Sequence, residues 1–151
     1  MSSSINQRKT IARNKATVSP TQKLLSKRFE PKRPYGQTGI CLVIWTDAGE
    51  RIRAFELSGH AGFAEAGQDI VCAGVSALSI AACNGLEYFL PAAFELQTEE
   101  GLLSCRFAGA EGQELEKAQW ILRTMILGIE QIQTAYNQKY IVIEQRRWTP
   151  C

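Results

Sequence analysis

The residues best suited to carry chemistry are one cysteine and one histidine near the middle of the chain. His60 is the single histidine of the sequence, and Cys72 follows it after a glycine-rich segment. A cysteine thiolate can attack an acyl carbon, and an imidazole can carry the proton to the leaving amine. This pair of residue types therefore indicates nucleophilic acyl transfer, provided that the fold brings the two side chains together.

The residues just before Cys72 strengthen this interpretation. Asp69 precedes a long apolar stretch, where a carboxylate can cap the start of a helix. Cys72 would then be the third helical residue, and the partial positive charge of a helix start favours thiolate over thiol. We therefore expect a lowered pKa for Cys72, helped by His60, and we expect first-turn amides such as that of Cys72 to stabilise an oxyanion.

Each of these residues also has an ordinary structural interpretation. A cysteine on an apolar helix is commonly a small core residue, and a lone loop histidine commonly lies on the surface. Asp69 could be a cap and nothing more. Ser76 falls one helical turn after Cys72 and could support the site, although such a serine commonly bonds back to the carbonyl one turn earlier. Spacing alone leaves these alternatives open.

Other classes of site are disfavoured. The segment 74–78 lacks the second glycine of a nucleophile elbow, and the glycines of the loop form neither a P-loop nor a dinucleotide fingerprint. The cysteines contain no C-x-x-C pair, so we expect neither a zinc site nor a disulfide framework. We accordingly predict no metal and no cofactor. The five cysteines are Cys41, Cys72, Cys83, Cys105 and Cys151.

Hydrophobic periodicity predicts the elements that would position these residues. Hairpins are expected at 40–57 and 94–107, around turns at 47–50 and 99–101. A helix buried on most sides is expected at 70–90, and the 3–4 spacing of apolar residues from 115 to 136 predicts a second helix of about 24 residues. A last strand is expected at 140–144. The order β-β-α-β-β-α-β predicts an α+β sandwich with a largely antiparallel sheet and two main helices.

Charge divides the chain into two parts. Residues 1–39 contain nine Lys or Arg and one acidic residue, whereas the remaining residues contain eight basic and 14 acidic ones. Few residues of the first part are apolar and three are proline, so we predict a disordered, flexible basic tail at 1–39 and a folded domain at 40–151. Two further interpretations of the tail stay open, an organellar transit peptide and an arm that contacts nucleic-acid phosphates.

The same patterns indicate the compartment. The N-terminus is polar and lacks the apolar region of a signal peptide, and the odd number of cysteines favours reduced thiols. The longest apolar run, 70–83, is shorter than a bilayer span and is interrupted by glycine and serine. We expect a cytoplasmic protein without membrane contact.

The segment 59–78 resembles the signature of the bacterial ribosomal-processing cysteine protease family, Prp. Gly59-His60-Ala61-Gly62 matches its Gly-His motif, and Asp69-Ile70-Val71-Cys72-Ala73-Gly74 matches the start of its first helix. The segment 118–125 is similar to the second helix of the family. The resemblance extends over residues 40–145, nearly the whole of the predicted folded domain.

This resemblance implies a small α/β sandwich, expected to form a homodimer, that acts as a cysteine endopeptidase. The implied substrate is the precursor of ribosomal protein twenty-seven of the large subunit, from which the enzyme removes an N-terminal extension. Cys72 would be the nucleophile and His60 the proton donor and acceptor, with Asp69 and Ser76 in supporting roles. The loop would be mobile and would order over the substrate. Its glycines are Gly59, Gly62 and Gly67.

The 39 residues before the first predicted strand depart from the family pattern, because family members begin close to that strand. The segment could reflect a misassigned start, a targeting segment, or an arm that contacts the ribosome or its RNA. The alternative function is a non-catalytic ribosome-associated module that binds RNA through this arm. Such a module would have no need for Cys72 and His60 at the spacing of the family.

Overall fold

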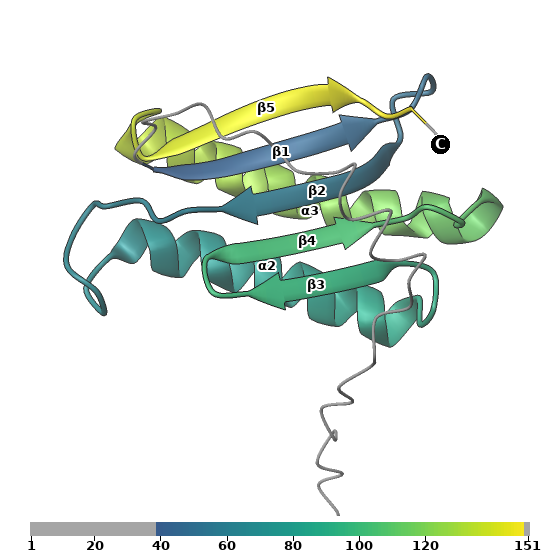
Figure 1. The fold of residues 1–151 in the computed structure, drawn as a ribbon, viewed down its shortest axis with the longest axis horizontal. Coiled ribbons are helices and arrows are strands. Elements are labelled where there is room, and N and C mark those ends of the chain that lie inside the picture. The colour runs from purple at the N-terminus through teal and green to yellow at the C-terminus, as the bar shows by residue number, and fades with distance from the viewer. Residues whose placement is uncertain (1–38, 150–151) are drawn as a thin grey trace, which may run out of the picture. The chain divides into compact units, whose positions relative to one another are not determined.

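A computed structural model describes residues 39–149, which form a five-stranded sheet and two long helices (Figure 1). The order of the elements is the predicted β-β-α-β-β-α-β, so the α+β prediction is confirmed. The predicted tail lies outside the described residues, apart from Gly39. In chain order the elements are β1 (Ile40–Thr46), β2 (Ile52–Ser58), α2 (Ile70–Phe89), β3 (Glu95–Glu99), β4 (Leu102–Arg106), α3 (Gly112–Tyr136) and β5 (Ile141–Arg147).

The sheet has the strand order β3-β4-β2-β1-β5. Every neighbouring pair is antiparallel except β1 and β5, which run parallel, so the prediction of a largely antiparallel sheet is confirmed. The register places Leu42 opposite Leu57 on one side and Ile143 on the other. Because side chains alternate between the two faces of a strand, these three apolar residues lie on the same face of the sheet.

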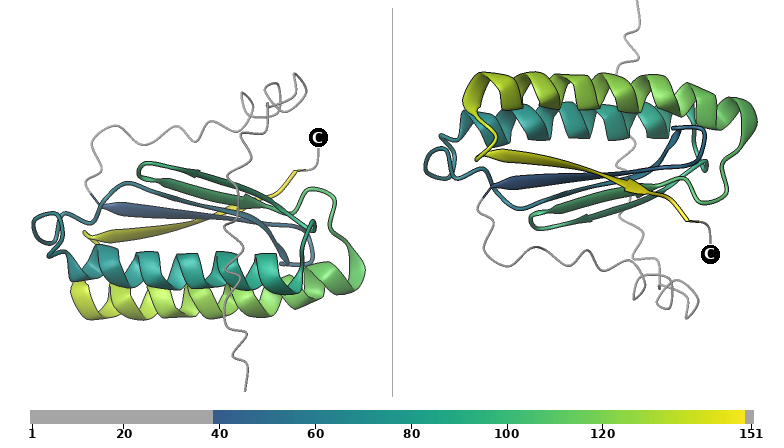
Figure 2. Two further views of the ribbon diagram at one scale, coloured as in Figure 1. Left: turned by 90° about the horizontal axis from the view of Figure 1, so that it is seen from below. Right: turned by 90° about the horizontal axis from the view of Figure 1, so that it is seen from above.

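Both helices cover one face of the sheet and lie side by side (Figure 2). They run antiparallel, because Gly74 near the start of α2 meets Ile132 near the end of α3, and Leu78 meets Gly128. A Cβ atom at Gly128 would lie only 2.8 Å from a methyl carbon of Leu78, so a larger residue there would require the Leu78 side chain to shift. The core lies between the helix pair and the sheet.

Helix α2 is less buried than its composition predicts. Its inner stripe consists of Val71, Val75, Ser79, Ala82, Cys83 and Leu86. Its outer side exposes large apolar residues, including Ile80 at 55% and Tyr88 at 81%, so the prediction of burial on most sides is wrong. By length and composition alone α2 could cross a membrane, with a mean hydropathy of 1.5. This differs from the expectation for the apolar run at 70–83, which is shorter than a bilayer span. The inner stripe nevertheless belongs to the core, as in an amphipathic surface helix.

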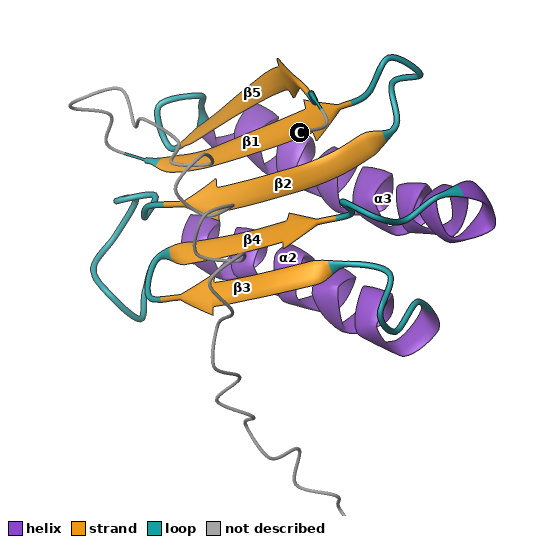
Figure 3. Ribbon diagram, turned by 45° about the vertical axis from the view of Figure 1, so that its right-hand side comes forward, coloured by secondary structure: helices purple, strands orange, loops and turns teal. Residues whose placement is uncertain are grey.

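Three connections meet at one end of the sheet (Figure 3). The loop from β2 to α2, the turn from β3 to β4 and the connection from α3 to β5 all lie there. The start of α2, which carries Cys72, lies at this end as well. The β1–β2 turn lies at the opposite end.

Candidate active site

The start of α2 is capped as the sequence predicts. Asp69 adopts an extended conformation, and its Oδ1 accepts a hydrogen bond of 2.9 Å from the backbone N–H of Cys72. The backbone N–H of Ala73 donates to the carbonyl oxygen of Asp69 at 3.0 Å. Cys72 is therefore the third residue of the helix and is held at its first turn.

The loop between β2 and α2 is fastened to its surroundings through Phe63. The backbone N–H of Phe63 donates to Asp69 Oδ2 at 3.0 Å. Its ring meets Tyr136 and Tyr140 edge-on, with ring centroids 5.4 and 5.2 Å apart. Asp69 and these aromatic contacts therefore tie the loop to the start of α2, the end of α3 and the residue before β5.

The Cys72 thiol is half-buried beneath this loop. Its Sγ accepts a hydrogen bond of 3.1 Å from the backbone N–H of Ala61. A hydrogen bond from the amide of Gly62 also lowers the pKa of the thiol. The amide of Ala61 is thus directed at the sulfur atom, and the neighbouring amide also favours the thiolate.

The pKa of Cys72 is nevertheless raised above the ordinary value of a thiol, so the expectation of a lowered pKa is wrong for this conformation. Burial is the largest cause, the Ala61 amide opposes it, and the negative charge of Asp69 raises the pKa further. The carboxylate that caps α2 has the same sign as a thiolate and offsets the positive end of the helix. Sequence spacing shows the cap but not how strongly its charge acts on the neighbouring sulfur.

His60 is exposed and lies beside the β3–β4 turn. Its Nε2 lies 3.5 Å from the place that a Cβ atom on Gly101 would occupy. Within residues 39–149 no hydrogen bond joins His60 to Cys72, although the next residue in the chain, Ala61, contacts the sulfur. The structure therefore brings the two predicted residues to the same end of the domain without pairing them.

Gly59, before the histidine, has a clear structural role. Its backbone N–H donates to the carbonyl oxygen of Gly101 at 3.0 Å, and its φ is 85°. A Cβ atom at Gly59 would lie 2.6 Å from the carbonyl oxygen of Gly39. Only glycine fits there, so Gly59 fixes the point at which the loop leaves β2.

The supporting residues take different positions. Both carboxylate oxygens of Asp69 accept backbone N–H groups, so Asp69 holds the loop and the helix start rather than His60. Ser76 is exposed one turn after Cys72, and the described part of the chain offers it no hydrogen bond. The serine that bonds back to the preceding turn is instead Ser79, whose Oγ donates to the carbonyl oxygen of Val75 at 2.7 Å.

Sequence reasoning missed Phe63, Tyr136 and Tyr140, and it missed the role of the Ala61 amide. Tyr136 ends the periodic series of the second helix, and Phe63 is the one aromatic residue between β2 and α2. These features were visible in the sequence. Their contact was not, because it joins a loop to the distant end of another helix.

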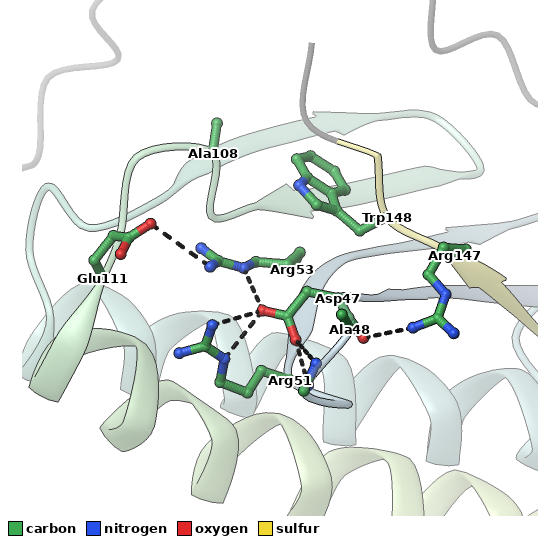
Figure 4. Close-up of a pocket in the computed structure, with 9 residues that line it drawn as sticks. Asp47, Ala48, Arg51, Arg53, Ala108, Glu111, Arg147 and Trp148 are labelled. Carbon is green, nitrogen blue, oxygen red and sulfur yellow. Dashed lines mark hydrogen bonds and ion pairs between the residues drawn. The ribbon is translucent and has the colours of Figure 1, made fainter.

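A second candidate site, a cavity of about 480 Å³, lies at the opposite end of the sheet (Figure 4). Asp47 Oδ2 accepts hydrogen bonds from both Arg51 and Arg53, and Arg147 donates to the carbonyl oxygen of Asp47. The three guanidinium groups therefore already have acceptors within the protein. The lining holds no cysteine, serine or histidine. Its residues are Asp47, Ala48, Gly49, Arg51, Arg53, Ala108, Glu111, Arg147 and Trp148.

Across residues 39–149 no group of three or more His, Cys, Asp or Glu side chains could hold a metal ion. Four of the cysteines fall within this range and none of them is in a disulfide. Burial raises the pKa of Cys83 to about 11, and burial also raises that of Cys105. Cys72 is the cysteine that lies at a helix start beneath a glycine-rich loop.

The family profile described as cysteine protease Prp matches residues 40–141, which contain the whole loop and the start of α2. The chain belongs to the Prp family of cysteine proteases. The ribosomal processing cysteine protease Prp of Bacillus subtilis (strain 168) is 38% identical over 91 residues, which cover 57% of this chain and 80% of that protein.

Solved structures agree with this membership. The essential ribosomal processing protease Prp from S. aureus, in complex with a covalently linked product peptide, has a TM-score of 0.63 and 27% identity, covering 71% of this chain and 99% of that one. SMU.848 from Streptococcus mutans has a TM-score of 0.62 and 28% identity, covering 74% and 97% of the two chains. Both proteins therefore share the α+β fold of residues 39–149.

Proposed function

We propose that this protein is a cytoplasmic endopeptidase that removes the N-terminal extension of ribosomal protein twenty-seven of the large subunit. Membership of a ribosomal processing protease family supports this proposal. The observation that carries it is the placement of Cys72 at the capped start of α2, with a loop amide 3.1 Å from its sulfur. The half-buried position of Cys72 and this hydrogen bond distinguish it from Cys83 and Cys105, which are buried in the core.

In the proposed reaction His60 takes the proton of the Cys72 thiol, and the sulfur adds to the carbonyl carbon of the scissile peptide. The C–N bond then breaks, and the leaving amine takes the proton from the imidazolium. Water adds to the resulting thioester and gives a proton to His60. The C–S bond breaks last, which releases the extension as a carboxylic acid and restores the thiol.

This sequence of steps requires His60 to move from Gly101 towards Cys72 when substrate binds. His60 is exposed, so its imidazole can turn about its side-chain bonds while the buried residue Ala61 stays in place. Asp69 supports the site by holding the loop between β2 and α2, and Ser76 faces solvent on the same side of α2 as Cys72.

The proposed substrate class is a peptide segment rather than RNA. The S. aureus Prp structure contains a covalently linked product peptide, so that protein binds a peptide. The alternative of a non-catalytic module depends on a basic arm at residues 1–39, almost all of which lie outside the described residues. We therefore keep RNA or ribosome contact by the arm as an outcome of the test below.

We further infer that the protein forms a homodimer. Large apolar side chains are exposed on both helices, among them Ile80 on α2 and Trp120 on α3, at 55% and 78%. Burying side chains of this size in an interface is favourable. Light scattering after size-exclusion chromatography should give twice the chain mass, and Trp120→Asp should shift the population towards monomer. A monomer at all concentrations would contradict the inference.

The deciding experiment is a cleavage assay with the precursor of ribosomal protein twenty-seven from the same host. Mass spectrometry should show one new N-terminus with the unaltered protein, and none with Cys72→Ala or His60→Ala. Cys41→Ala, which alters a half-buried strand cysteine, is the matched control and should cleave normally. An uncut precursor, together with binding of ribosomal RNA that is lost when residues 1–39 are removed, would favour the RNA-binding module. Cleavage by Cys72→Ala would overturn the catalytic proposal.

A further inference from the structure

We infer that the oxyanion hole of this protease is formed by the backbone amides of Ala61 and Gly62, and not by those of Cys72 and Ala73. This inference rests on the proposed role of Cys72 as nucleophile. It goes beyond that role because it names the groups that stabilise the charge on the substrate.

The amides of Cys72 and Ala73 are already engaged. The N–H of Cys72 donates to Asp69 Oδ1 at 2.9 Å, and the N–H of Ala73 donates to the carbonyl oxygen of Asp69 at 3.0 Å. An amide that caps its own helix could turn to a substrate oxygen only by giving up the cap. The helix start therefore offers neither of these two donors to the substrate.

A loop amide, by contrast, points at the reacting atom. The N–H of Ala61 donates to Cys72 Sγ over 3.1 Å, and the amide of Gly62 follows it directly in the chain. Gly62 has a φ of 65°, in the left-handed region. A left-handed residue lets successive N–H groups point to the same place, which is an arrangement that binds anions.

The donor pair is held in place by an anchor on each side. The residue Ala61 is only 3% exposed and belongs to the hydrophobic core, so its backbone cannot shift freely. On the other side the Phe63 N–H is bound to Asp69 Oδ2 at 3.0 Å. The two amides are thus held between a core anchor and the carboxylate that caps α2. Preorganised donors of this kind are effective because they need little reorganisation during the reaction.

In the addition step, the same amides are placed to donate hydrogen bonds to the carbonyl oxygen of the substrate. A sulfur electron pair forms the C–S bond, and the π pair of the carbonyl moves to its oxygen, which becomes negative. That oxygen is bonded to the carbon that the sulfur has just attacked, so it lies next to the sulfur. An amide that now donates to Sγ can instead donate to this oxygen, at a distance of about 2.7–3.1 Å. When the adduct collapses, the pair returns to the carbonyl and the C–N bond breaks, and the amides keep their protons throughout.

An ester in place of one backbone amide tests this inference directly. Ala61→lactic acid removes the N–H and keeps the methyl group, and Ala66→lactic acid makes the same change at an exposed position of the same loop. The substrate is a fluorogenic peptide that spans the cleavage site of the precursor, and kcat/KM is measured across pH. Circular dichroism and thermal melting establish that both variants fold.

We expect the high-pH plateau of kcat for Ala61→lactic acid to fall about 100-fold or more, with KM nearly unchanged. The Ala66 ester should stay within about threefold of the unaltered protein, since the reaction makes no use of that amide. If the Ala61 ester only moves the midpoint of the pH profile upward and recovers the full plateau, its amide serves the thiolate alone. That result would overturn the inference.

A peptide aldehyde separates this inference from the proposed substrate. The aldehyde forms a hemithioacetal with Cys72 and places its oxygen where the oxyanion would lie, without any cleavage. We expect the Ala61 ester to bind it about 100-fold more weakly than the Ala66 ester does. Equal binding would overturn the inference while leaving Cys72 as nucleophile. Weakened binding together with an uncut ribosomal precursor would support the oxyanion hole and refute the substrate.

Discussion

Asp69 accepts the backbone N–H of Cys72 at 2.9 Å, and the same carboxylate raises the pKa of the Cys72 thiol by its charge. Burial is the largest cause of the raised pKa, and the charge of the residue that caps the helix start adds to it. Such a thiol is protected from adventitious alkylation and oxidation, which require the thiolate. His60, placed beside Gly101, would activate it only after moving.

Asp69→Asn should lower the apparent pKa of Cys72. An asparagine oxygen can still accept the Cys72 N–H, but the substitution removes the negative charge that disfavours the thiolate. The rate of iodoacetamide labelling against pH, read for the Cys72 peptide by mass spectrometry, should rise at lower pH than in the unaltered protein. Glu65→Gln, an exposed carboxylate of the same loop, is the control and should leave the profile in place. A profile that moves upward in Asp69→Asn would refute this assignment.

Gly62→Ala should reduce kcat much more than Gly67→Ala. Both glycines have positive φ and both have open space where a Cβ would be, so the strain of an L-residue is similar, about 1–2 kcal/mol each. Of the two, only Gly62 adjoins Ala61, whose amide donates to Cys72 Sγ, so strain at Gly62 acts directly on that amide. Thermal melting should show comparable losses of stability in the two variants, while peptide cleavage separates them by about tenfold or more. Equal kinetic effects would mean that the loop acts only as a flexible cover.

Phe63→Ala should speed alkylation of Cys72 and slow peptide cleavage. The two ring contacts of Phe63 contribute about 0.5–1.5 kcal/mol each to holding the loop over the thiol. Without them, burial of Cys72 decreases and its pKa falls, but the loop amides are no longer held in place. Phe89→Ala disrupts a comparable edge-on aromatic pair at the other end of α2 and serves as control. Alkylation and cleavage changing in the same direction would contradict the proposed role of Phe63.

Asp47 should contribute to stability in a pH-dependent way. Burial alone would raise its pKa, but hydrogen bonds from Arg51, Arg53 and the Gly49 amide outweigh it and lower the pKa to about 2, from 3.8. Because the folded pKa is depressed, the contribution is complete above pH 4 and is lost as pH falls towards 2. At pH 7 it amounts to about 2 kcal/mol.

Urea unfolding of Asp47→Asn should show this loss at pH 7, with a difference from the unaltered protein that shrinks between pH 4 and pH 2. Glu100→Gln, an exposed acid in the β3–β4 turn, should show no such difference. Peptide cleavage at pH 7 should be unchanged, since the β1–β2 turn, which contains Asp47, lies at the opposite end of the sheet from the start of α2 (Figure 1). A constant difference at all pH values would argue against an ionised Asp47 as the source of the stability.

The order of the elements and the start of α2 could be predicted from the sequence because they depend on local signals. Alternating and 3–4 apolar spacing marked the strands and helices, and Asp69 before an apolar stretch marked the cap. The parallel pairing of β1 with β5 could not be predicted, since it depends on where α3 returns the chain. The exposure of Ile80 and Tyr88 was missed because composition shows how apolar a helix is, but not how many of its sides are covered.

The members of the site were easier to predict than their arrangement. Cys72, His60 and Asp69 could be named from residue type and spacing, and the structure places all three at one end of the domain. The raised pKa of Cys72 could not be predicted because it reflects burial and the distance to one carboxylate. The engagement of the Cys72 amide by its own cap likewise depends on geometry that no sequence pattern encodes.

The most direct test of the account is to trap the acyl-enzyme. The protein is mixed with the ribosomal precursor, the reaction is quenched in acid within a single turnover, and the products are digested and weighed. We predict an added mass equal to the N-terminal extension minus one water, on the peptide that contains Cys72 and released by hydroxylamine. A cleaved precursor with no adduct on Cys72, or with the adduct on another cysteine, would contradict the assignment of Cys72 as the nucleophile.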